Sequence, residues 1–194
     1  MPNWCLNIAE ITGSKEAIAK IKNAIDSIET GSKPSVFKTL VGIHPEVTQE
    51  EYVNGKWYDA NLDHWGTKWD VSVEDCIFNF DEESFTMQPE TAWSPPLGFY
   101  KALGNKYGVS VEATYEEPGC DFAGKYTIDA DGNETDECYP YTEGLYRTDF
   151  DHFMHEIEYQ FEEGEITEES LREAFPFVSE EDMQFIIQEY IKQD

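Results

Sequence analysis

The sequence is short of basic side chains. Its 194 residues hold 13 Lys and Arg against 41 Asp and Glu, which gives a formal net charge of −28 at pH 7. Such a field repels nucleic-acid backbones and anionic membrane surfaces, so we expect no direct binding to nucleic acid or membrane. It attracts basic partners, including proteins that themselves hold nucleic acid. A surface that serves only solubility is the alternative interpretation.

Cysteines and long apolar runs are also scarce. The four cysteines are scattered and form no CxxC pair, so neither a zinc knuckle nor a redox pair is indicated. No apolar stretch approaches membrane-spanning length, and the opening "MPNWCLNIAE" lacks the basic start and apolar run of a signal peptide. We therefore expect a soluble protein of a reducing cytoplasm.

Familiar catalytic motifs are missing as well. The sequence contains no GxSxG, no P-loop, no GxGxxG and no Cys-His pair with supporting spacing. This weighs only slightly against an enzyme, because small nucleases can work with scattered acids. We expect a non-enzymatic protein with no cofactor and no bound metal.

Hydrophobic residues make up 40% of the chain, and aromatic residues alone make up 14%. The chain should therefore fold despite its charge. Periodicity predicts a first strand with Leu6, Ile8 and, after a shift of phase, Ile11 as its apolar side. It then predicts a helix capped by Ser14 and a strand from Trp69 that continues past a bulge near residue 75. A return strand follows over 85–93. A second helix, capped by Ser94, is predicted over 95–107, and a last strand over 109–115. Residues 49–65 look like a long ordered loop.

This order of strand, helix, strand, strand, helix, strand is that of the ferredoxin-like βαββαβ fold, with both helices on one face of an antiparallel sheet. The fold class is therefore α+β. We expect a ferredoxin-like domain over 1–126, a β-hairpin extension over 127–147 that turns at Asp131-Gly132, and an acidic helical region over 148–194.

The helical region carries most of the charge. Residues 131–194 hold 20 acids and 3 bases, and yet their three predicted helices have apolar stripes. A folded acidic surface is therefore expected rather than a disordered tail. Its apolar stripes could pack on the core or on a second copy of the chain.

Four segments together resemble a known family: "MPNWC.N" at the start, "HWGTKWDV", "TAWSPP" and "EEPGCDFAG". They are similar to the YubB ferredoxin-like family of phage and plasmid proteins, over about residues 1–126. His64 stands where that family usually has Asn. The resemblance implies a ferredoxin-like fold, a mobile-element origin and a bacterial cytoplasmic setting, and it implies no reaction.

The tryptophans allow two interpretations. Trp65 and Trp69 are four residues apart, and with Trp93 they could line a pocket in which Lys68 holds an anionic or planar ligand. They could equally be core anchors that fix a loop to the sheet.

Three further segments can be weighed between a structural and a chemical interpretation. Glu116, Glu117 and Asp121 could perform acid–base work or hold a cation, or could belong to a tight turn in which Asp121 caps backbone N–H groups. The "DADGNETDE" segment fails the EF-hand register and is better explained as a hairpin turn. The histidines of "HFMHE" are expected to be solvated.

The leading hypothesis is a phage- or plasmid-type binding protein whose acidic surface engages and inhibits a basic host protein. The residues expected to contribute are the glutamates of the helical region: Glu156, Glu158, Glu162, Glu163, Glu168, Glu169 and Glu173. Two alternatives stay open. One is a small-ligand or nucleotide site at Trp65, Lys68, Trp69, Trp93 and Asp121, and the other is a metal-dependent hydrolase that uses the acids of residues 116–121.

Overall fold

A computed structural model describes residues 3–29, 31, 35–161 and 166–191. The strands are β1 (Trp4–Thr12), β2 (Ile77–Phe80), β3 (Ser84–Gln88), β4 (Glu90–Ala92), β5 (Ser110–Glu117), β6 (Phe122–Ile128) and β7 (Glu134–Tyr139). The helices are α1 (Lys15–Asp26), α2 (Val36–Leu40), α3 (Gln49–Glu51), a π-helical turn (Tyr52–Lys56), α4 (Trp57–Trp65), α5 (Leu97–Tyr107), a 3-10 turn (Pro118–Cys120), α6 (Tyr141–Thr148), α7 (Phe150–Gln160), α8 (Glu168–Ala174) and α9 (Glu180–Tyr190).

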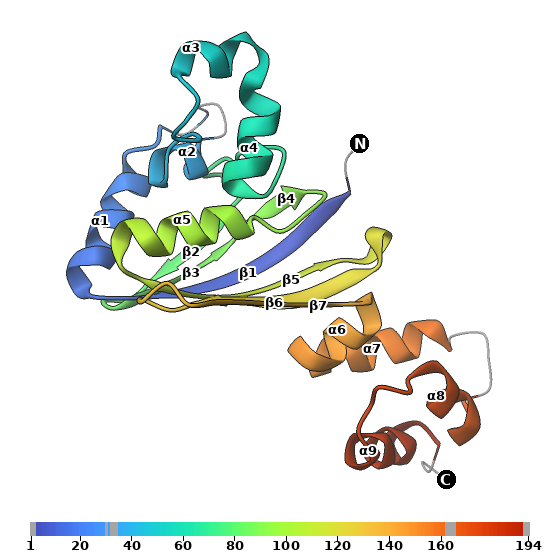
Figure 1. The fold of residues 1–194 in the computed structure, drawn as a ribbon. Coiled ribbons are helices and arrows are strands. Elements are labelled where there is room, and N and C mark those ends of the chain that lie inside the picture. The colour runs from blue at the N-terminus through green and yellow to red at the C-terminus, as the bar shows by residue number, and fades with distance from the viewer. Residues whose placement is uncertain (1–2, 30, 32–34, 162–165, 192–194) are drawn as a thin grey trace.

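The seven strands form one antiparallel sheet in the order β2-β3-β1-β5-β6-β7, and β4 also pairs with β1. Helices α1 and α5 lie on the same face of this sheet (Figure 1). Strands β1, β2, β3 and β5 with these two helices reproduce the predicted ferredoxin-like order, so the α+β prediction is confirmed. The hairpin β6–β7 extends the sheet beyond β5.

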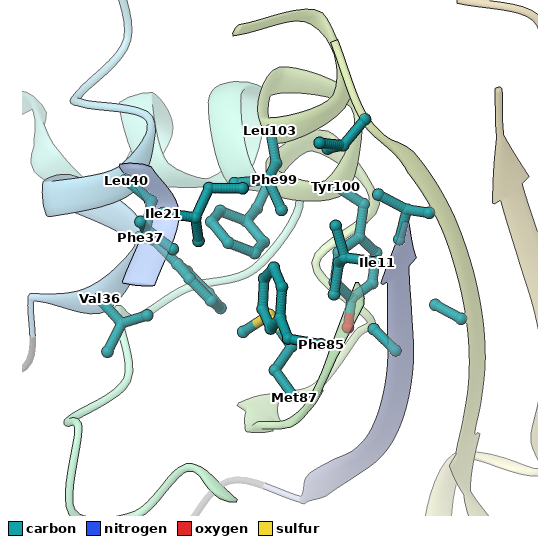
Figure 2. Packing of buried hydrophobic residues seen from close by; sticks show 14 of the residues in the cluster. Ile11, Ile21, Val36, Phe37, Leu40, Phe85, Met87, Phe99, Tyr100 and Leu103 are labelled. Carbon is teal, nitrogen blue, oxygen red and sulfur yellow. The ribbon is translucent and has the colours of Figure 1, made fainter. Parts of the chain in front are cut away.

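The main core fills the space between the sheet and these helices, and Figure 2 shows its centre. The rings of Phe37 and Phe99 are stacked with centroids 4.1 Å apart, and Phe85 and Met87 rise toward them from β3. The isoleucines of α1 at positions 18, 21 and 25 are buried, as their helical spacing predicts.

The orientation predicted for the first strand is wrong. The core-facing residues of β1 are Cys5, Asn7, Ala9 and Ile11, whereas Leu6 and Ile8 are 44% and 53% exposed on the opposite face. Both faces of the strand carry apolar residues, so periodicity could not choose between them. The choice was made by the two helices, which cover only one face.

Residues 69–73, predicted as a strand, form none. Val71 is buried as its alternation indicates, but its carbonyl accepts hydrogen bonds from the backbone N–H groups of Ser35 and Val36. The carboxylate of Asp70 accepts from the N–H groups of Phe37 and Lys38 at the start of α2. The segment is therefore held by the beginning of a helix rather than by a strand.

Two other local predictions are corrected. Residues 49–65 form short helices rather than a loop, with a break at Gly55 (φ 122°), and a capping box between Thr48 and Glu51 begins α3. Ser94 does not cap α5, whose N-cap is Pro96; instead its hydroxyl donates to the carbonyl of Gly66 at 2.7 Å.

The C-terminal helices lie on the other side of the sheet from α1 and α5 (Figure 1). Their stripes form a second core around Leu145, Phe153, Leu171, Phe175 and Ile187. The predicted helices are present, and the caps Thr167 and Ser179 hold the starts of α8 and α9. Helix α6 was not predicted; it seats this second core on Ala123 of β6.

Candidate functional site

The tryptophan motif is divided between the core and the surface. Trp65 is 1% exposed, packs edge-on against Phe37 and donates its indole N–H to the carbonyl of Gly42 at 3.0 Å. It is a core anchor. Trp69 is 37% exposed, and its ring lies under the ammonium of Lys68 at 4.6 Å.

The structure does not join the three predicted rings in one pocket. The neighbour of Trp69 is Trp4 of β1, with ring centroids 6.1 Å apart. Trp93 is 46% exposed with a positive φ of 74°, and within the described ranges no ring contact links it to Trp65 or Trp69. Lys68 also lies over the ring of Tyr58.

The polar residues of these motifs hold the fold together. The buried Thr67 hydroxyl donates to the carbonyl of Ala92 at 3.1 Å. The two N–H groups of the buried Asn7 amide are shared among three acceptors, the carbonyls of Cys5 and Pro89 and the hydroxyl of Thr91, at 2.9 to 3.0 Å from its nitrogen. The motif segments therefore bind one another around the β3–β4 break, which gives these residues a structural role.

The acids of "EEPGCDFAG" point in different directions. Glu117 is buried and accepts from the N–H of Gly119 and the amide of Asn3, at 3.0 and 3.4 Å. Asp121 adopts a left-handed conformation (φ 57°) and accepts from the N–H of Tyr141 at the start of α6. This is the capping role that the sequence indicated. The three carboxylates do not converge on one point.

Glu116 faces the C-terminal helices. Its carboxylate lies 3.3 Å from the imidazole of His152 on α7, so this pair joins the sheet to the helical region. Burial raises the pKa of Glu116 above its usual value; His152 acts in the opposite direction, and Asp149 and Glu156 reinforce the rise. The expectation that His152 is simply solvated is therefore incomplete.

The sheet face opposite α1 and α5 carries a groove. One cavity of about 260 Å³ lies between the strands and the C-terminal helices, with Leu6, Ile8 and Ile77 on the strand side and Leu145 and His152 on the helix side. A second cavity of about 470 Å³ is lined by Trp4 and Trp69.

Both cavities are lined by Asp75 and Glu90, so they adjoin. We call the two together the open-face groove. Sequence reasoning missed it, although the signal was present: "WCLNIAEIT" is apolar on both faces, whereas a strand with one solvated face should alternate with polar residues.

Five of the seven predicted partner-binding glutamates lie on α7 and α8. Glu158, Glu168, Glu169 and Glu173 are exposed, and Glu156 is half-buried beside Glu116. Glu168 pairs with Arg172 at 2.9 Å. Glu162 and Glu163 lie outside the described residues.

Comparison with known proteins bears on the fold. A family model described as a ferredoxin-like domain in Api92-like protein matches residues 64–158. The chain is thus similar to a ferredoxin-like family. The match supports that fold family rather than the YubB family by name.

Two other comparisons add no function. A crystal structure of a protein api92 from Yersinia pseudotuberculosis aligns over 73% of this chain and 98% of its own, with 11% identity and a TM-score of 0.45. The search of curated proteins gave no significant match.

Two kinds of feature are absent from the described residues. No group of three or more His, Cys, Asp or Glu side chains there could hold a metal ion. Nor is any helix within those ranges long and apolar enough to cross a membrane.

Proposed function

We propose that this protein is a non-enzymatic binding protein of a phage or plasmid, whose acidic surface engages and inhibits a basic host protein. The observation that carries the proposal is the way the C-terminal charge is mounted. Glu158, Glu169 and Glu173 are exposed on helices whose other sides are buried in a second core. A fixed acidic surface steers a basic partner and binds it in a salt-sensitive way.

The alternative of a small-ligand or nucleotide site has less support. Its pocket required Trp65, which lies in the core, and it required Trp93 beside Trp69. The hydrolase alternative required converging acids, and Glu116, Glu117 and Asp121 have separate partners.

The test is capture of host proteins on the immobilised full chain at low and at high salt. One variant carries Glu158→Gln, Glu169→Gln and Glu173→Gln. A matched control removes the same number of exposed carboxylates from α3 and α4, by Glu50→Gln, Asp59→Asn and Asp63→Asn.

We expect a defined basic protein to be retained at low salt and released at high salt, with weaker capture by the first variant only. Purified partner should then lose its own activity when the chain is added. If both variants lose capture equally, capture depends on the net charge of the chain and not on the glutamates of α7 and α8, which contradicts the proposal. The proposal is also contradicted if the chain retains no basic protein.

A further inference from the structure

The open-face groove exposes apolar side chains where a sheet normally hides or avoids them. Ile8 and Ile77 are 53% and 58% exposed, and β1, which carries Ile8, is an inner strand paired on both sides. Of the eleven exposed large hydrophobic residues within the described ranges, five line this groove: Trp4, Leu6, Ile8, Trp69 and Ile77. Such concentration marks an interaction surface rather than scattered surface residues.

A helix already packs on the neighbouring part of this face. Helix α6 crosses β6 so closely that a Cβ on Gly144 would lie 2.4 Å from the carbonyl oxygen of Ala123. Leu145 of α6 and His152 of α7 then form one wall of the groove. Beyond them, the strand face toward β2 is left without a covering helix (Figure 1).

Carboxylates flank the apolar line. In the strand register Leu6 pairs with Glu90 on β4 at one side and with Glu116 on β5 at the other. Cross-strand neighbours lie about 5 Å apart, so both carboxylates border the same side chain. Asp75 and Asp149 add to the lining. Within the described chain no Lys or Arg lines either cavity, and Lys68 lies over the ring of Trp69, at 4.6 Å.

We propose that the open-face groove binds a cationic amphipathic helix of a partner protein. An apolar line bordered by carboxylates is complementary to a helix with an apolar stripe between Lys or Arg side chains. Alternate residues of β1 are about 6.8 Å apart and successive i, i+4 residues of a helix about 6 Å, so the two lines run in near register. Both edges of β1 are already paired, which leaves its face, and not an added strand, as the way to bind.

Charge argues against the other occupants. A second copy would bring a second acidic border against the first. Single-stranded RNA stacks on aromatic residues of open sheets of this kind, and such sites surround the aromatic side chains with positive charge. Here the ammonium of Lys68 over Trp69 is outnumbered by the lining carboxylates of Asp75, Glu90, Glu116 and Asp149, which disfavours a phosphate backbone. The inference rests on the proposed function only in taking the partner to be basic.

The test uses the full chain and a synthetic helical peptide of Leu, Ala and Lys, with Leu at i, i+3, i+4 and i+7 and Lys on both flanks. A scrambled peptide of the same composition controls for charge alone, and a U-rich RNA oligonucleotide controls for base stacking. Affinity is measured by fluorescence anisotropy. The groove variant carries Ile8→Thr and Ile77→Thr, and Glu90→Gln is a second variant; the control is Val53→Thr, which alters a residue 71% exposed outside the groove.

We expect the amphipathic peptide to bind at least tenfold more tightly than its scramble. The groove variant should lose at least tenfold in affinity and Glu90→Gln about threefold, while Val53→Thr stays unchanged. Equal binding of both peptides, equal binding by the groove variant, or preferred binding of RNA would overturn the inference. The inference would also be overturned if the wild type is a dimer and the groove variant is a monomer, because a second copy of the chain would then occupy the groove.

The two proposals fail separately. If the basic host protein is captured but the groove variant binds the amphipathic peptide as tightly as the wild type, the groove inference fails and the proposed function stands. If no basic host protein is captured but the peptide binds the groove, the proposed function fails and the groove remains a helix-binding site.

Discussion

His152 of α7 lies 3.3 Å from Glu116 of β5, and this pair connects the C-terminal helices to the sheet at the wall of the open-face groove. The pair is surrounded by acids: Asp149 and Glu156 both face Glu116, and Tyr141 lies against the same site. Burial and the neighbouring acids therefore raise the pKa of Glu116 by more than His152 lowers it.

The first prediction concerns Glu116 and pH. Because its pKa is raised in the folded state, ionising it costs stability, and that cost appears as the pH rises through the raised pKa. Glu116→Gln should therefore raise the melting temperature by a few degrees at pH 8 and leave it unchanged at pH 4. Thermal unfolding between pH 4 and 8 measures this, and a difference that is constant with pH would contradict it.

The second prediction concerns the link between α8 and α9. Arg172 donates two hydrogen bonds of 2.8 Å to Glu180, which lower the pKa of that carboxyl to about 2. A lowered pKa contributes stability above the ordinary value near 4.5, and this stability is lost as the pH falls toward 2. Glu180→Gln should melt a few degrees lower than the wild type at pH 7 and should match it at pH 2.

Circular dichroism of the full chain measures that convergence. The control is Glu181→Gln, an exposed neighbour on the same turn, which should melt like the wild type at both pH values. An unchanged gap for Glu180→Gln at pH 2 would show that the ion pair is not its origin.

The third prediction concerns thiol reactivity. Burial raises the pKa of Cys5 and of Cys76 to about 12, whereas Cys120 and Cys138 are exposed. Hydrogen bonding to Glu117 also raises the pKa of Cys120. Iodoacetamide should therefore modify Cys138 first and Cys120 second, and the two buried thiols at least about 100-fold more slowly. Peptide mass spectrometry over time gives the order; early labelling of Cys5 would contradict the packing of β1.

The fourth prediction concerns Asn7. Its amide satisfies two buried carbonyls and the Thr91 hydroxyl, so Asn7→Ala leaves those groups without their donor. We expect a loss of roughly 2–4 kcal/mol in the free energy of unfolding, measured by urea denaturation. Asn79→Ala, at an exposed position of β2, is the matched control and should change it by less than about 0.5 kcal/mol.

The sequence alone determined the order of the elements in the ferredoxin-like core and the three C-terminal helices α7, α8 and α9. Period-3.6 stripes with Ser14 and Ser179 as caps specified helices, and the order of strands and helices specified the ferredoxin-like core. These signals are local, because hydrophobic periodicity and helix capping act within a few residues of one another. The hairpin turn at Asp131-Gly132 was predicted for the same reason. The capping role of Asp121 was also indicated, but its partner Tyr141 lies 20 residues further along the chain, so only the tertiary structure identified that partner.

Only the tertiary structure decided which faces are covered. Trp65 entered the core while Trp69 joined Trp4 at the surface, although both belong to one motif. Leu6 and Ile8 stayed exposed because α1 and α5 pack on the other face, while α6 packs mainly on β6. Burial depends on which distant element packs against a strand, and a strand that is apolar on both sides carries no local signal for that choice.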